Sequence, residues 1–138
     1  MIKYDEFMNK PLALYSRVEH QAEVVRRLEN ICMSTTNQMG ERVQTSRQNT
    51  QEKRYVVLAD AQKKLDEMAS DLMKACDEVR EFLYSNLSHE DADILEWRYV
   101  DGKSLIEIAE IQGLSYQTVK NRMSEADREA RRRYANKP

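Results

Sequence analysis

The stretch "DGKSLIEIAEIQGLSYQTVKNRM", residues 101–123, decides the fold. It contains two of the three glycines in a chain of 138 residues, and a serine closely follows each one. Serine is a favoured N-cap because its hydroxyl accepts from free amides of the first turn, and glycine often ends a helix because it adopts a positive φ without strain. The alternation predicts that one helix ends at Gly102. It also predicts a short helix between Ser104 and Gly113, and a third helix capped by Ser115.

Acidic residues three positions after two of the serines strengthen these helix starts. Ser104 with Glu107 forms a capping box, and Ser88 with Asp91 forms a similar one in which Asp replaces the usual Glu. We therefore expect helices that begin after Ser88, Ser104 and Ser115, the last continuing to about residue 134.

Two longer apolar patterns precede this region. The first predicts a helix from about Pro11 to Met33, and the second predicts one from Tyr55 to about Asn86. The polar residues between them, about 34–52, are expected to form a linker. An antiparallel pair within the chain and a dimer would both cover the longer apolar seam, and the greater length of the second helix favours self-association. The first seam comprises Leu14, Val18, Gln21, Val25, Leu28 and Cys32, and the second Leu58, Ala61, Leu65, Met68, Leu72, Ala75, Val79 and Phe82.

The composition favours an all-α protein, because one third of the residues are charged and glycine and proline together number five. We predict a long, coiled-coil-like helical arm followed by a C-terminal helix-turn-helix. The predicted domains are residues 1–87, an arm for dimerisation or partner binding, and residues 88–138.

Several functional classes lack a signal in the sequence. No stretch approaches the ~20 apolar residues that span a bilayer, and the first ten residues do not resemble a signal peptide, so we expect a cytoplasmic protein. Cys32 and Cys76 lie in helical patterns and are expected to be buried, reduced thiols. No metal-ligand spacing, nucleophile with a base, or phosphate loop is present, so no metal, cofactor or enzymatic activity is predicted.

Charge is unevenly distributed along the C-terminal part of the chain. Residues 115–138 carry seven basic and three acidic side chains, a net of +4, whereas residues 88–114 carry two basic and seven acidic ones, a net of −5. Such an asymmetry lets one face of a domain meet phosphate while another is kept away from it.

The two short helices fit the requirements of a helix-turn-helix, whose second helix enters the major groove of DNA. Ala109 supplies a small residue on the first helix, Gly113 supplies the turn, and Val119 supplies an inward apolar residue on the second. The polar residues that remain on the second helix can reach bases or phosphates. The predicted DNA-binding residues are Ser115, Tyr116, Gln117, Thr118, Lys120, Asn121, Arg122 and Arg128.

The stretch "ILEWRYVDGKSLIEIAEIQGLSYQTVKNRMSEA" resembles the fourth, promoter-recognising region of bacterial sigma factors, especially of the extracytoplasmic-function type. The resemblance covers about residues 87–134. It rests on Arg98-Tyr99, Asp101-Gly102, Glu107-Ile108-Ala109 and the run from Thr118 to Met123. It implies promoter DNA as the ligand and an ion pair between Arg98 and Glu107.

The chain departs from that family at three positions. Gln112 stands where the family usually has an apolar residue, and Glu125 and Asp127 stand where it often has basic ones. Phosphate contacts would then rely on Arg122, Arg128 and the arginines at 131–133.

The order of a helical arm, "ERVQTS", a long helix and a sigma-like C-terminus is similar to phage and prophage late-transcription regulators of the ArpU and RinA type. The resemblance implies a phage- or prophage-encoded, sequence-specific regulator that binds double-stranded DNA. A homodimer through the arm is expected, and host RNA polymerase is a candidate partner. The alternative is a helical interaction protein that binds RNA polymerase or a phage protein without reading DNA.

Overall fold

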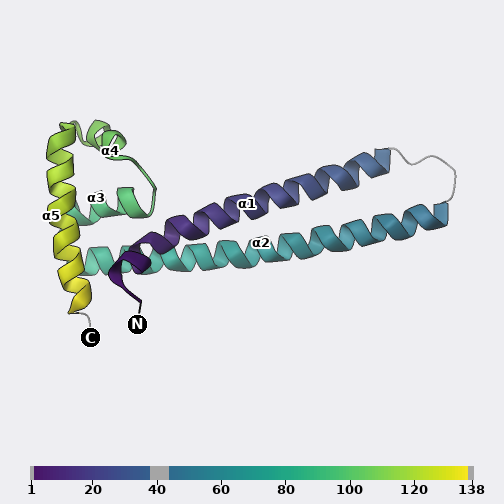
Figure 1. The fold of residues 1–138 in the computed structure, drawn as a ribbon, viewed down its shortest axis with the longest axis horizontal. Coiled ribbons are helices and arrows are strands. Elements are labelled where there is room, and N and C mark those ends of the chain that lie inside the picture. Colours follow the sequence, from purple (N-terminus) through teal and green to yellow (C-terminus); the bar gives the residue numbers. More distant parts are fainter. Residues whose placement is uncertain (1, 38–43, 137–138) are drawn as a thin grey trace. The chain divides into compact units, whose positions relative to one another are not determined.

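The computed structural model describes residues 2–37 and 44–136, and the side chains of all of these except 34–37 and 44–49. All regular structure in these ranges is helical, which confirms the all-α prediction (Figure 1). No helix among them is long and apolar enough to cross a membrane. The helices are α1 (Tyr4–Asn37), α2 (Gln44–Asn86), α3 (His89–Tyr99), α4 (Leu105–Gln112) and α5 (Tyr116–Ala135).

The chain divides into two compact units. The hairpin unit is Tyr15–Asp71, and the helix-turn-helix unit combines the residues up to Leu14 with those from Leu72 onward. Helices α1 and α2 therefore each contribute to both units. The predicted boundary between residues 87 and 88 falls inside the helix-turn-helix unit, because the first turns of α1 and the last turns of α2 share this unit with α3, α4 and α5.

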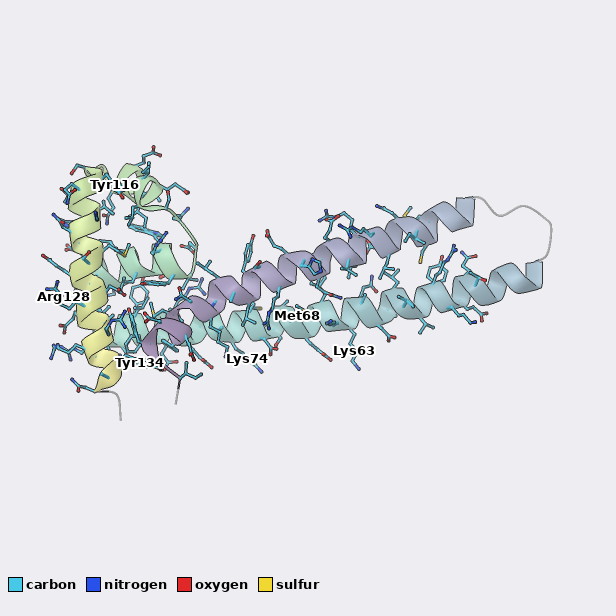
Figure 2. The ribbon with its side chains drawn as sticks, in the orientation of Figure 1. Lys63, Met68, Lys74, Tyr116, Arg128 and Tyr134 are labelled. Atoms are coloured by element: carbon cyan, nitrogen blue, oxygen red, sulfur yellow. The ribbon has the colours of Figure 1, made fainter. Side chains whose placement is uncertain are left out.

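In the hairpin unit α1 and α2 run antiparallel (Figure 1), and Val25 and Cys32 of the first predicted seam are buried. Gln21 is only 7% exposed, and its Nε2 donates a 3.0 Å hydrogen bond to the carbonyl oxygen of Ala61. Met68 projects from the side of α2 that faces α1, whereas Lys63 points away (Figure 2). The partner of the α2 seam in this unit is thus α1 of the same chain.

Both long helices extend beyond the predicted bounds. Helix α1 begins at Tyr4, so Pro11 lies inside it and does not start it. The helix continues through Pro11 because Tyr4, Phe7 and Met8 are buried in the core of the helix-turn-helix unit, and this burial outweighs the hydrogen bond that proline removes.

The predicted linker at 34–52 is largely wrong. Residues 34–37 belong to α1 and residues 44–52 to α2, while residues 38–43 lie outside the described residues. The stretch from 44 to 52 contains no glycine or proline, and its Gln, Arg, Glu and Ser side chains cost a helix little.

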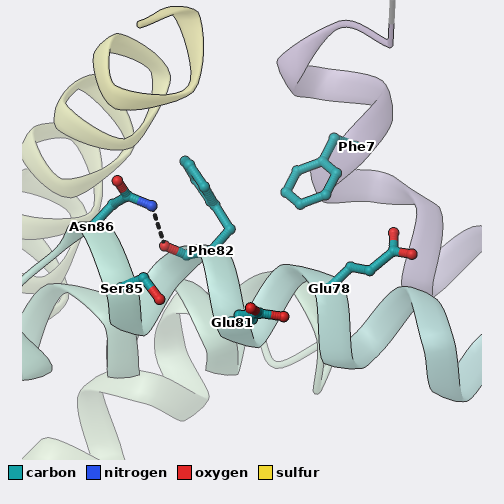
Figure 3. Close-up of a pocket in the computed structure, with 6 residues that line it drawn as sticks. All are labelled: Phe7, Glu78, Glu81, Phe82, Ser85 and Asn86. Carbon is teal, nitrogen blue, oxygen red and sulfur yellow. Dashed lines mark hydrogen bonds between the residues drawn. The ribbon is translucent and has the colours of Figure 1, made fainter. Parts of the chain in front are cut away.

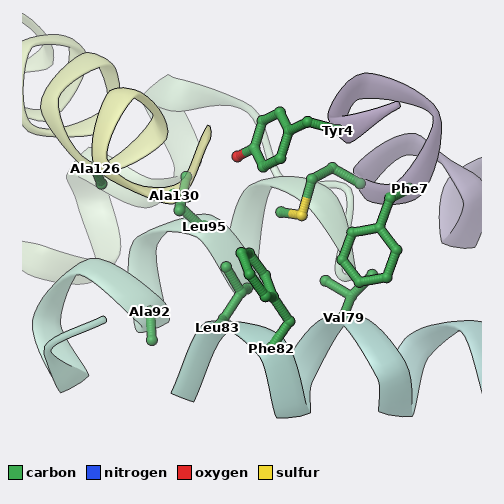
Figure 4. Packing of buried hydrophobic residues seen from close by; sticks show 10 residues of the cluster. Tyr4, Phe7, Val79, Phe82, Leu83, Ala92, Leu95, Ala126 and Ala130 are labelled. Atoms are coloured by element: carbon green, nitrogen blue, oxygen red, sulfur yellow. The ribbon is translucent and has the colours of Figure 1, made fainter. Parts of the chain in front are cut away.

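The core of the helix-turn-helix unit joins segments from both ends of the chain. Side chains from the first turns of α1, the end of α2, α3 and α5 pack into one cluster (Figure 4). Met123 packs against this cluster and against a smaller one between α4 and α5. The helix-turn-helix is therefore anchored on the same core as the N-terminal segment. The first cluster comprises Tyr4, Phe7, Met8, Val79, Phe82, Leu83, Ala92, Leu95, Ala126 and Ala130.

Candidate nucleic-acid interface

The turn between α4 and α5 is made by Gly113, whose φ is +66°. The amide of Leu114 donates to the carbonyl of Ala109 at 3.0 Å, and the amide of Gly113 donates to the carbonyl of Glu110 at 3.3 Å. This is the Schellman pattern, which satisfies free carbonyls at a helix end and needs a residue that tolerates a positive φ. The predicted role of Gly113 is confirmed.

The start of α4 has the predicted capping box. The amide of Glu107 donates to Ser104 Oγ at 3.2 Å, and the Glu107 carboxylate accepts from the amide of Ser104 at 3.3 Å. Ser88 caps α3 by accepting from the amide of Asp91. These local bonds fix where α3 and α4 begin.

Helix α5 is held by its inner side. Val119 is fully buried against Ile108 and Ala109 of α4, with Leu105 and Leu114 packed around them. The small side chain of Ala109 lets α5 approach α4 closely, as the sequence predicted. Among the apolar residues of α3, α4, α5 and the turn between α4 and α5, Ile94, Leu95, Ile108, Ala109 and Val119 are buried and Leu114 and Met123 are half-buried.

Ser115 begins α5 as predicted. Its Oγ accepts from the amide of Thr118 at 3.2 Å and lies 2.8 Å from the Thr118 hydroxyl oxygen. The capping bond satisfies one amide of the first turn, and the positive end of the helix dipole lies beside it. This arrangement suits a phosphate group next to the start of α5.

The outer side of the first two turns of α5 carries most of the predicted DNA-binding residues. Gln117 and Asn121 are exposed one turn apart, and Gln117 Nε2 donates to Asn121 Oδ1 at 3.2 Å. Lys120 and Arg122 are also exposed, on either flank of these amides. Tyr116, 49% exposed, lies at the very start of the helix (Figure 2), and Thr118 is half-buried.

Arg128 lies apart from this group. It is exposed on α5 twelve residues after Tyr116, which corresponds to ~18 Å along the helix (Figure 2). The structure thus gathers seven of the eight predicted residues at the start of α5 and places Arg128 farther along the same helix.

The three consecutive arginines near the end of α5 are held by acidic partners. Arg131 makes a two-bond contact with Asp5 of α1, the shorter bond being 2.9 Å, and its guanidinium lies 4.8 Å from the centre of the Tyr4 ring. Arg132 and Arg133 both donate to Glu129, at 2.6 and 2.9 Å, and these bonds lower the Glu129 pKa to about 2. Any contact between these three arginines and DNA phosphates would therefore compete with their ion pairs to Asp5 and Glu129.

The expected ion pair between Arg98 and Glu107 is not formed. Arg98 donates to the carbonyl of Lys103 at 3.4 Å, and the Glu107 carboxylate is occupied by the capping box. Neither residue has an ion-pair partner within the part of the chain that the structure describes. Helix α3 is joined to α4 by packing of Trp97 against the cluster that contains Ile108 and Ala109. The turn that follows α3 contains Gly102, which has a φ of +70°, and is closed by the amide of Lys103, which donates to the carbonyl of Trp97 at 2.9 Å.

Asp127 has a structural role that the sequence did not reveal. One oxygen of its carboxylate accepts from the Tyr4 hydroxyl at 2.6 Å and from the Tyr99 hydroxyl at 3.1 Å. Burial raises the pKa of Tyr99 to about 12, with a further contribution from the Asp127 charge, and the pKa of Tyr4 is raised for the same reasons. The acidic residue at this position therefore points into the unit.

Tyr134, near the end of α5, also contacts the N-terminal segment. The Tyr134 hydroxyl donates to the carbonyl of Ile2 at 2.8 Å, and its ring stacks on Phe7 with centroids 5.1 Å apart. The only sequence signal for this contact was the aromatic spacing of Tyr4 and Phe7 one helical turn apart.

A shallow pocket of about 260 Å³ lies between α1 and the end of α2 (Figure 3). Phe7 and Phe82 form its apolar side, and Glu78 and Glu81 line its rim. Asn86, also on the rim, donates to the carbonyl of Phe82 at 2.9 Å. In the described ranges no three His, Cys, Asp or Glu side chains are grouped so that they could hold a metal ion. Cys32 and Cys76 are not in disulfides; Cys32 is buried, as predicted, whereas Cys76 is only half-buried.

Comparison with known proteins agrees with this geometry. Residues 83–126 match the family described as "Sigma-70, region 4". The matched segment runs from the last turn of α2 through α3 and α4 to the middle of α5, and both of its end residues, Leu83 and Ala126, are buried in the core. No curated protein and no solved structure matches the chain. The helix-turn-helix of this chain thus lies in a domain similar to region 4 of sigma-70 factors, a family of DNA-binding, non-enzymatic domains.

Proposed function

We propose that the protein is a sequence-specific transcriptional regulator that binds double-stranded DNA at promoters through α5. The observation that carries this proposal is that α5, within the segment similar to sigma-70 region 4, has one buried apolar side and one exposed polar side. Val119 anchors one side, while Gln117, Lys120 and Asn121 project from the other. Residues at the start of the second helix of such a motif are the ones that reach base edges.

The charges of the unit support a defined orientation on DNA. Lys120, Arg122 and Arg128 are exposed, and none of them has an ion-pair partner in the described ranges. Helix α4 instead exposes Glu107 and Glu110, which phosphate would repel. Approach with the start of α5 towards the groove places the basic side chains near phosphate and the acidic ones away from it.

A single module of this size seldom reaches the affinity that two half-sites provide. We propose that the hairpin unit supplies a homodimer contact through apolar side chains that it leaves exposed, such as Met33, Val56 and Val57. The order of a long helical hairpin followed by a sigma-like module favours a phage- or prophage-encoded regulator, with host RNA polymerase as its protein partner.

The proposal is tested by measuring DNA binding of the full chain over a range of salt concentrations. A site selected from random DNA should bind with an affinity that falls steeply with salt. The double variant Lys120→Ala, Asn121→Ala should lose at least about tenfold in affinity for that site, because it removes one phosphate and one base contact. The matched control is Asn9→Ala with Lys10→Ala, an exposed pair of the same two residue types on α1 within the helix-turn-helix unit. Equal losses in both double variants would refute the assignment of α5.

A second function is favoured by the apolar side chains that α4 exposes. Ile106 is 62% and Ile111 is 51% exposed, on either side of the two glutamates. These exposed isoleucines and glutamates would be explained if α4 bound another protein through a surface that carries both basic and apolar side chains. It would bind its partner without showing salt-dependent affinity for DNA, which separates the two functions in the same experiment.

A further inference from the structure

We infer that α5 reads two adenines about two base pairs apart, one with Gln117 and one with Asn121. The inference rests on the proposed DNA-binding function and names the class of site that this helix would select. It is carried by the placement of two amides, their mutual hydrogen bond and the positions of the neighbouring cations.

Gln117 and Asn121 lie on the side of α5 opposite its anchor. Each is two residues from the buried Val119, and successive residues of a helix are ~100° apart, so both project ~160° away from it. No other side of the first two turns is farther from the core. When the helix lies in the major groove, these two side chains are the ones aimed at its floor.

The separation of the two residues matches a short interval of DNA. Four residues of α-helix rise ~6 Å, and successive base pairs are ~3.4 Å apart. If α5 follows the groove, the two amides meet bases about two steps apart. Both are exposed, so no rearrangement of the core is needed for them to extend.

The chemistry of an amide selects adenine. In the major groove adenine presents an acceptor at N7 beside a donor at N6, and a Gln or Asn amide offers the complementary donor and acceptor. Guanine presents two acceptors, at N7 and O6, and leaves the amide oxygen facing a like group. Each amide can therefore form two bonds with adenine and only one with guanine.

The hydrogen bond between the two amides still allows each of them to form two hydrogen bonds with adenine. Gln117 Nε2 uses one of its two hydrogens on Asn121 Oδ1. Gln117 keeps an N–H donor and its carbonyl acceptor, and Asn121 keeps both N–H donors and a second lone pair on its oxygen. The bond also restricts the rotation of both side chains before DNA arrives, which reduces the entropy lost on binding.

The cations that would favour guanine lie on the flanks. Lys120 is one residue after Val119 and Arg122 three residues after it, so they project to opposite sides of the amide stripe. From these positions they reach towards the phosphates that border the groove. The floor of the groove is thus left to the two amides.

The test is selection of bound sequences from random DNA with the full chain, followed by affinity measurements on the selected site. We expect two enriched adenines, two base pairs apart. Replacing either adenine by 7-deazaadenine, which lacks the N7 acceptor, should weaken binding by about 10-fold or more, and the same replacement outside the pair should have no effect.

Substitutions assign each base to its residue. Gln117→Arg and Asn121→Arg should each shift the preference from adenine to guanine at one position only, and the two positions should differ. Asn9→Arg, at an exposed position of α1 within the helix-turn-helix unit, adds the same charge and should leave the selected sequence unchanged.

The outcomes distinguish this inference from the function on which it rests. Salt-dependent binding with an enriched site that lacks the adenine pair, or with a pair insensitive to both variants, would overturn the inference and leave the DNA-binding function standing. Absence of any salt-dependent DNA binding would overturn both. Enrichment of the pair with the predicted shifts would establish both.

Discussion

The hydroxyl of Tyr4, in the first turn of α1, donates a 2.6 Å hydrogen bond to the carboxylate of Asp127 on α5. The two residues are 123 positions apart in the sequence, and Tyr99 of α3 donates to the same oxygen. Three helices therefore meet at one carboxylate. The segment similar to sigma-70 region 4 spans residues 83–126, so Tyr4 and Asp127 both lie outside it and only Tyr99 lies inside. The contact adds the N-terminal segment to the unit.

Tyr4→Phe should destabilise the helix-turn-helix unit by about 1–2 kcal/mol, because a hydrogen bond to a charged acceptor is lost while the ring stays packed. A double-mutant cycle with Asp127→Ala, read from urea unfolding, should give a coupling energy of similar size. Tyr15→Phe, at a half-exposed tyrosine of the hairpin unit, is the control and should change little. A coupling energy near zero would contradict the role of Asp127.

Stability should fall at alkaline pH. The pKa of Tyr99 is about 12 in the folded protein against an ordinary value of 10, because burial and the Asp127 charge disfavour the phenolate. This contribution to stability is complete below about pH 10 and is lost as the pH rises towards 12. The free energy of unfolding of Tyr99→Phe should decline less over this window than that of the unaltered chain. Parallel declines would show that Tyr99 does not titrate with folding.

Glu129→Gln should increase DNA affinity several-fold at low salt. The carboxylate of Glu129 holds Arg132 and Arg133, and its loss frees two cations on the helix that we propose contacts DNA. The slope of log affinity against log salt should steepen by up to about two. Glu23→Gln is a matched control, because Glu23 pairs with Arg26 and Arg27 at the same spacing in the hairpin unit. Equal effects of the two variants would indicate a general charge effect.

The two turn glycines should respond differently to substitution. Gly113→Ala should cost about 1 kcal/mol for the left-handed conformation alone, since a Cβ there meets nothing within 4 Å. Gly102→Ala should cost more, because its Cβ would also lie 3.1 Å from Leu12 Cδ2. Gly113→Asn should retain most of the stability, because asparagine tolerates this conformation. Thermal unfolding of the three variants checks this order of stabilities. A loss of stability in Gly102→Ala no larger than in Gly113→Ala would show that the Leu12 side chain moves aside.

Gln112→Met should stabilise the unit by about 1 kcal/mol. The side-chain oxygen of Gln112 is buried and has no hydrogen-bond partner among the described residues, so an apolar side chain of similar shape removes a desolvation cost. Urea unfolding measures the gain, and Gln62→Met at an exposed position should show none. A loss of stability would mean that the Gln112 amide is satisfied in solution.

The features that the sequence predicted well are local. Ser104 and Glu107 cap α4 through bonds that span three residues, and the outward position of Gln117 follows from helical spacing relative to Val119. Glu129 could similarly have been paired with Arg132 and Arg133 from their spacing. Sequence alone therefore predicts the short helices and the candidate interface.

The features that could not be predicted from the sequence depend on contacts between residues far apart in the chain. Nothing near Asp5 in the sequence indicates that it pairs with Arg131, or that Tyr134 stacks on Phe7. Pro11 resembled a helix start because proline suits a first turn, and only the buried residues before it show that the helix begins earlier. The polar stretch before Tyr55 resembled a linker because its side chains are polar. It is nevertheless helical, because most of these residue types are compatible with a helix.

The order in which the chain is synthesised gives the split helix-turn-helix unit a further consequence. Tyr4 leaves the ribosome before its partner Asp127, which follows 123 residues later, and Phe7 likewise precedes its partner Tyr134. Long-range contacts of this kind form late, because the intervening chain must first be complete. The end of α2 can cover part of the Phe7 ring before α5 is made, since Phe7 also packs on Phe82. A product released before residue 127 would lack the carboxylate that joins α1, α3 and α5. Synthesis of α5 would thus act as a checkpoint for a stable helix-turn-helix unit.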